Sequence, residues 1–83
     1  MKLLYFAWIR SRVGFSEEVV DPPPNVKDIQ SLIDWLKTRS NAMEDAFQDL
    51  AAIRVAVNQN YVEFDHLINA GDEIAFFPPV TGG

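Results

Sequence analysis

The 83-residue sequence contains no cysteine. Disulfide bridges, thiolate zinc sites, iron–sulfur clusters and cysteine nucleophiles are therefore excluded, so any sulfur chemistry would have to use another group. The sequence also lacks a run of about 18 apolar residues, which predicts that no segment spans a membrane. Its apolar start has no small-residue cleavage site and is followed at once by Arg10 and Arg12. We therefore expect no signal peptide and a cytoplasmic protein.

Basic residues are scarce, with seven lysines and arginines against 12 acidic residues and a formal net charge of -5. This balance disfavours nucleic acid as a partner, because proteins that bind it carry basic faces. It suits a partner with a basic docking surface. Many cytosolic proteins are acidic simply for solubility, so charge alone does not choose between these explanations.

No group of side chains has the pattern of a catalytic or metal site. His66 is the only histidine and has no evident relay partner, which favours a surface or turn position. Glu17 and Glu18 are adjacent on a predicted strand and would point to opposite faces, so they would not converge on one ion. The four glycines form no phosphate-binding loop. We expect no metal, no bound cofactor and no active site built from side chains.

The clearest predicted element is a helix over residues 26–38. Its apolar residues recur at i, i+3, i+4 and i+7, which makes one apolar stripe: Ile29, Leu32, Ile33 and Leu36. Asn25 is the expected N-cap, and Asp28 is placed to support the first turn.

The remaining segments predict mostly strands. We expect strands over residues 2–9, 16–20, 53–57, 61–64 and 73–77. A hairpin connection containing Gly14 is expected over residues 10–15, and a short helical turn around residues 43–47. The first and last strands are strongly apolar and could lie side by side in the centre of a sheet. The predicted fold class is α+β, a mixed sheet packed on one main helix.

Pro78 and Pro79 end the last strand, so we expect a domain over residues 1–77 and a flexible tail over residues 78–83. The two terminal glycines lack a Cβ and suit a tail that threads a narrow channel. Extended, six residues reach about 20 Å. The reacting group would be the α-carboxylate of Gly83, which is ionised at neutral pH and must be activated by another enzyme. An inert, frayed terminus explains the same residues equally well.

The end of the chain resembles a known family. Residues 71–83 read GDEIAFFPPVTGG, and this block, with Val57-Asn58-Gln59 and Phe64-Asp65 before it, is similar to the small subunit of molybdopterin synthase. The start, with Phe6-Ala7, Arg10 and Gly14, is also similar. The resemblance implies a ubiquitin-like β-grasp fold and a sulfur carrier that works in molybdenum cofactor biosynthesis.

The resemblance also implies a role for each tail residue. Gly83 would be adenylated by a ubiquitin-activating-type adenylyltransferase that uses ATP, and then converted to a thiocarboxylate. Val80, Thr81 and Gly82 would thread into the large subunit of the synthase, where two carriers in succession donate sulfur to precursor Z. The family assembly is a heterotetramer of two large and two small subunits. The chain would be a co-substrate that holds no cofactor itself.

A partner-binding surface is predicted at Phe77, Pro78 and Pro79. If Ile74 and Phe76 face the core, Phe77 faces the other way and begins an exposed apolar surface. Alternatively, Phe77 packs under a loop. Other functions also remain open at this point: sulfur delivery for thiazole or tRNA thiolation, attachment to lysines, or a ubiquitin-like binding module with a chemically silent tail.

Overall fold

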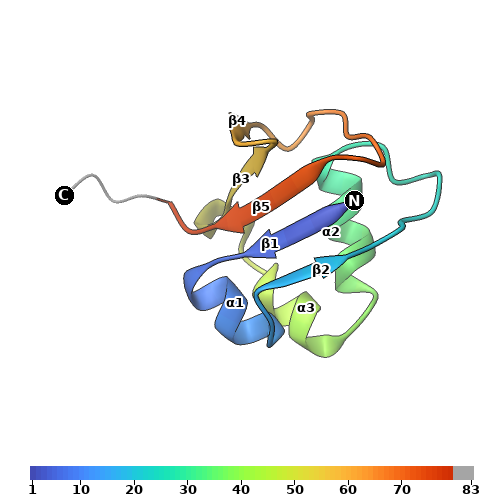
Figure 1. Ribbon diagram of the computed structural model, residues 1–83. Coiled ribbons are helices and arrows are strands. Elements are labelled where there is room, and N and C mark those ends of the chain that lie inside the picture. Colours follow the sequence, from blue (N-terminus) through green and yellow to red (C-terminus); the bar gives the residue numbers. More distant parts are fainter. Residues whose placement is uncertain (80–83) are drawn as a thin grey trace.

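The computed structural model describes residues 1–79. Its centre is a five-stranded sheet in the order β2-β1-β5-β3-β4 (Figure 1). The strands are β1 Lys2–Tyr5, β2 Glu17–Val19, β3 Arg54–Val57, β4 Asn60–Val62 and β5 Glu73–Phe77. β1 and β5 run parallel to each other, and the other neighbouring pairs are antiparallel. The predicted pairing of the first and last strands in a mixed sheet is confirmed.

Helices cover one face of this sheet. They are α1 Ala7–Val13, α2 Ile29–Lys37 and α3 Asn41–Ala46, with a 3-10 helix, η1, at Leu50–Ala52. The predicted apolar stripe of α2 is fully buried, and Met43, Ala46 and Phe47 around α3 are buried beside it. The core therefore lies between the sheet and α2, as predicted for the main helix, with α1 packed on α3 at one end.

The predicted strand over residues 2–9 is wrong in its second half. β1 ends at Tyr5, and the segment predicted as a hairpin connection is mostly helix α1. Ala7 has a positive φ of 53° and turns the chain, after which Ile9 and Val13 bury one helical face. Gly14 has a φ of 96° and ends α1, where its N–H donates to the Arg10 carbonyl. The glycine thus closes a helix by the left-handed conformation that suits its lack of a Cβ.

The start of α2 also differs from the prediction. The N-cap is Asp28 rather than Asn25, and its side chain accepts a 2.8 Å hydrogen bond from the Ser31 N–H. The Ser31 hydroxyl accepts in return from the Asp28 N–H, which completes a capping box. Hydrogen bonding by the Ser31 side chain, and then by the Ser31 N–H, holds the pKa of the Asp28 carboxyl below its usual range.

The third strand ends in a tight hairpin. Asn58 and Gln59 join β3 to β4, and both have positive φ, of 50° and 72°. That combination is the mark of a type I′ turn, whose twist matches the flanking strands. β4 is shorter than the predicted strand over residues 61–64, because the Phe64 carbonyl accepts from the Gln30 N–H and leaves the sheet.

Candidate functional site

The predicted site residues fall into two groups, because the structure describes them only as far as Pro79. Phe77 ends β5, the central strand, and Pro78 and Pro79 follow it half-buried. Val80, Thr81, Gly82 and Gly83 lie outside the described residues. Their threading and chemical roles, and the division of the chain at residue 77, therefore stay predictions.

Phe77 points away from the core. Along β5, Ile74 and Phe76 are fully buried, while Glu73, Ala75 and Phe77 alternate with them on the opposite side. The predicted orientation is confirmed. The Phe77 ring contacts the ring of Tyr61, a β4 residue, with centroids 5.3 Å apart. Phe77 therefore packs against a side chain of β4 and not under a loop.

We call the sheet face opposite the helices the outer face. The strand registers place four of its residues in one line across β1, β5, β3 and β4: Leu4, Ala75, Ala56 and Tyr61. The two alanines have short side chains, so the centre of the outer face is shallow, and the apolar side chains around it are larger. Phe6 remains extended and its N–H donates to the Phe76 carbonyl, so it continues the alternation of β1 beside Phe77.

The outer face exposes two aromatic side chains. Phe6 is 44% exposed and Tyr61 is 74% exposed. Apolar side chains exposed on one face often mark partner sites, and partner binding here stays a prediction. These side chains adjoin the end of β5, so a partner seated on them would also lie beside Pro78 and Pro79.

The sequence predicted Phe77 at this surface but not Phe6 or Tyr61. The signal was present in part, because Phe6 follows Leu4 at the period of a strand. Phe6 and Tyr61 lie near Phe77 because of the order in which the strands pair, and packing across the whole domain sets that order.

The acidic residues of β2 serve the fold. Glu17 pairs with Lys2 at 3.2 Å, whereas Glu18 accepts from the Tyr5 hydroxyl at 2.8 Å and pairs with Arg39 at 2.9 Å. The two carboxylates diverge, as predicted. Burial, together with the hydrogen bond to Glu18, raises the pKa of the Tyr5 hydroxyl, which therefore stays protonated.

Within residues 1–79, no three histidine or acidic side chains gather as a metal site would require. His66 is exposed, and its backbone carbonyl accepts a hydrogen bond from the Ile29 N–H. In the same part of the chain, no helix is long and apolar enough to cross a membrane.

The fold and the outer face define a ubiquitin-like β-grasp protein. The solved structure of small archaeal modifier protein 1 from H. volcanii is similar, with a TM-score of 0.78 and 28% identity over 96% of this chain and 97% of that one. Residues 3–83 match the ThiS family, and the chain belongs to that family.

Two relatives are similar along the whole chain. The molybdopterin synthase sulfur carrier subunit of Escherichia coli is 37% identical over 100% of this chain and 99% of its own length. The human protein of the same description is 35% identical over 100% of this chain and 93% of its own. Both comparisons include the tail residues, so the resemblance seen in residues 71–83 belongs to a full-length similarity.

Proposed function

We propose that this chain is the sulfur carrier subunit of a molybdopterin synthase and that the Gly83 carboxyl carries the sulfur. The observation that supports this most is full-length similarity to relatives described as such subunits, at 37% and 35% identity. The structure adds a physical reason. The strand that leads to the tail lies in the middle of the sheet, with an apolar surface beside its end.

The chemistry follows from the group at the end of the chain. A terminal carboxylate has a pKa of about 3.3–3.7 and is a poor electrophile at neutral pH. An adenylyltransferase must therefore join one carboxylate oxygen to the α-phosphorus of ATP and release pyrophosphate. A sulfur donor then attacks the carbonyl carbon and AMP leaves, which produces a thiocarboxylate.

The domain contributes docking and position. In the large subunit the thiocarboxylate sulfur is transferred to precursor Z: the C–S bond of the terminus breaks, and water supplies the oxygen that restores the carboxylate. Because the tail reaches about 20 Å when extended, the outer face can rest on the partner while the tail enters it. Gly82 and Gly83 lack side chains that would block a narrow channel.

The direct test is reconstitution of the pathway with the purified adenylyltransferase, ATP, a sulfur donor and the large subunit. Intact-mass analysis of the full chain should show replacement of one oxygen by sulfur, and precursor Z should be converted. A chain that lacks Gly82 and Gly83 should do neither, although its melting temperature should be unchanged. Full activity of this truncated chain would overturn the proposal.

A second candidate function is attachment of Gly83 to lysine amines of other proteins. It is favoured by the 28% identity to small archaeal modifier protein 1 over nearly the whole chain. The same reconstitution distinguishes the two. A carrier accumulates as a thiocarboxylate of single-chain mass, whereas a modifier appears in conjugates joined by an isopeptide bond.

A further inference from the structure

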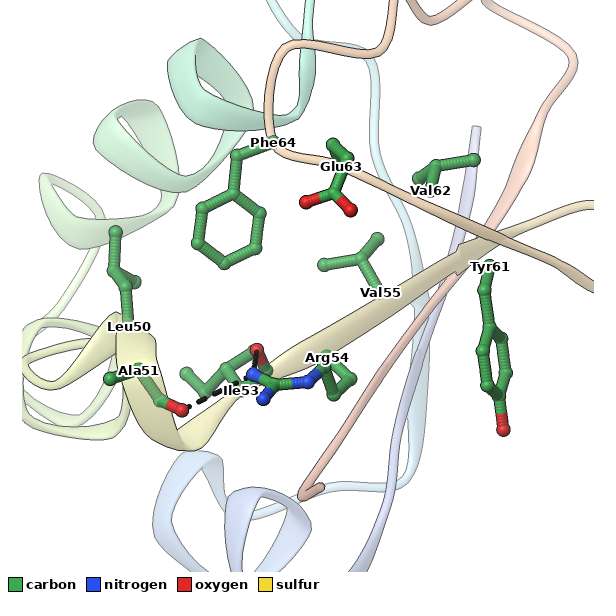
Figure 2. A pocket seen from close by; sticks show the side chains of 9 residues that line it. All are labelled: Leu50, Ala51, Ile53, Arg54, Val55, Tyr61, Val62, Glu63 and Phe64. Atoms are coloured by element: carbon green, nitrogen blue, oxygen red, sulfur yellow. Dashed lines mark hydrogen bonds between the residues drawn. The ribbon is translucent and has the colours of Figure 1, made fainter. Parts of the chain in front are cut away.

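A groove lies along the free edge of β4, next to the outer face. It has a volume of about 710 Å³ and runs between η1 and the hairpin of β3 and β4 (Figure 2). Its lining is largely apolar, from Leu50, Ala51, Ile53, Val55, Val62 and Phe64, and it also includes Tyr61 and the charged residues Arg54 and Glu63. Ile53 and Val55 are buried and form the floor, whereas Leu50, Val62 and Phe64 are half-buried along the sides.

Tyr61 offers a free backbone donor and acceptor at this edge. Val57 and Asn60 close a two-residue turn and form the first pair of the hairpin, which is hydrogen-bonded in a type I′ turn. Hydrogen-bonded and non-hydrogen-bonded pairs alternate along an antiparallel ladder, so the next pair, Ala56 and Tyr61, is not bonded. The Tyr61 N–H and C=O therefore point away from β3, where the sheet order has no further strand among the described residues.

Arg54 supplies a prepared binding site for a carboxylate at one end of the groove. Its Nη1 donates to the carbonyl oxygens of Ala51 at 3.2 Å and Ile53 at 3.1 Å, which fixes the guanidinium (Figure 2). The Nε and Nη2 hydrogens remain, and these two groups form the fork that binds a carboxylate through two parallel hydrogen bonds. Within residues 1–79, Arg54 forms no ion pair.

The groove is continuous with the outer face. Tyr61 lines the groove and also contacts Phe77 on the outer face, and Arg54 lies directly opposite Phe77 in the register of β3 and β5. A partner that covers Phe77 thus reaches Arg54 and the edge of β4 without a gap.

We propose that this edge receives an extended segment of the synthase large subunit, which adds to the sheet as a strand beside β4. The segment pairs with the N–H and C=O of Tyr61, places an apolar side chain between Leu50 and Phe64, and sets a carboxylate on Arg54. Main-chain pairing of this kind gives affinity, and the pockets for alternate side chains give specificity. The inference rests on the proposed function, because it names the same partner.

The charge of the chain makes Arg54 informative. With a net charge of -5, the chain as a whole favours a basic partner surface. Arg54 is a cation on its docking side that forms no ion pair within residues 1–79, although the carboxylate of Glu63 lines the same groove, and it favours the opposite sign at one point of the partner. Such a point fixes the register of docking and rejects carriers that lack the cation.

The test is a calorimetric titration of full-length chain with the large subunit of the same organism. Arg54→Glu should weaken binding roughly tenfold or more, and Arg54→Lys should weaken it less but measurably, because it keeps the charge and loses the fork. The matched control is Lys37→Glu at the end of α2, which does not line the groove and should bind as the unaltered chain does. Equal melting temperatures for the variants exclude unfolding as the cause.

Amide hydrogen exchange tests the added strand without a substitution. The Tyr61 amide should exchange rapidly in the free chain and at least tenfold more slowly in the complex. The amide of Gln59, at the tip of the hairpin, serves as the reference. Unchanged exchange at Tyr61, or unchanged affinity of Arg54→Glu, would each overturn the inference.

Phe77→Ala separates this inference from the proposed function. If Phe77→Ala weakens binding while Arg54→Glu and the Tyr61 amide show no effect, the proposed function stands and the groove is not a contact. If the unaltered chain does not bind the large subunit, both are wrong.

Discussion

Phe76 and Phe77 are adjacent in the sequence but face opposite sides of the sheet. Replacing Phe76 by alanine should therefore reduce mainly stability, whereas replacing Phe77 should reduce mainly binding. Phe76 is fully buried, and its ring lies 4.9 Å from that of Phe47 and 5.8 Å from that of Tyr5. Loss of a buried phenylalanine ring costs about 3–5 kcal/mol in folding free energy. Phe77 is half-buried and loses mainly its contact with Tyr61, which we expect to cost about 1 kcal/mol.

These costs are large or small only relative to the stability of the domain. At roughly 0.05–0.15 kcal/mol per residue, a chain of this size has about 4–12 kcal/mol of unfolding free energy. Phe76→Ala should therefore lower the melting temperature by about 15–30 °C or prevent folding. Phe77→Ala should lower it by less than about 8 °C.

The affinity for the large subunit should depend on Phe77, although the stability of the domain depends mainly on Phe76. Phe77 lies at the centre of the contact that we propose, and aromatic residues in such positions commonly contribute about 2 kcal/mol or more, or roughly 30-fold in affinity. We expect Phe77→Ala to lose that affinity for the large subunit in a titration, at a temperature where the circular dichroism spectrum shows it folded. An unchanged affinity of folded Phe77→Ala would refute the docking role of the outer face.

Three further perturbations test the fold. Gln59→Gly should raise the melting temperature by a few degrees, about 0.5 kcal/mol, because glycine adopts the φ of 72° without strain; a fall in a thermal scan would contradict this. Because the pKa of Asp28 is lowered on folding, its contribution to stability is complete above about pH 4 and is lost as the pH falls through the folded-state pKa. Asp28→Asn keeps a capping side chain but cannot titrate, so its unfolding free energy, measured with denaturant, should fall less steeply at acid pH. An identical fall in both chains would exclude Asp28 as a source of the acid dependence. Burial, and then the hydrogen bond to Glu18, raise the pKa of Tyr5, so its contribution to stability is complete below about pH 10 and is lost as the pH rises through the folded-state pKa. Tyr5→Phe lacks this group and should lose less stability than the unaltered chain on going to alkaline pH. Equal losses would contradict the raised pKa of the buried hydroxyl.

The main helix and the family resemblance of residues 71–83 could be recognised from the sequence because their signals are local. The apolar spacing from Ile29 to Leu36 can form one continuous face only on a helix, and the structure buries all four residues of that stripe. Residues 71–83 carry their resemblance in consecutive letters, which needs no knowledge of the fold. Their chemistry, too, belongs to the end of one polymer chain.

The helix α1 could not be recognised in the same way. Residues 3–9 are apolar at every position, so neither a period of two nor one of 3.6 stands out. The strand ends at Tyr5 because Ala7 takes a left-handed conformation, and Ile9 and Val13 then find their place against α3. A local sequence pattern does not contain that competition between strand and helix, since the packing partner lies some 30 residues away.

The sequence by itself determined the composition and the main helix. It excluded cysteine chemistry, and it carried the resemblance in residues 71–83 on which the proposed role of the Gly83 carboxyl rests. Only the tertiary structure decided that Phe6, Tyr61 and Phe77 share one surface and that Arg54 and the edge of β4 lie beside it. The physical reason is that strand order and register depend on pairing between distant segments, and these are chosen by burial of the whole core rather than by any one segment.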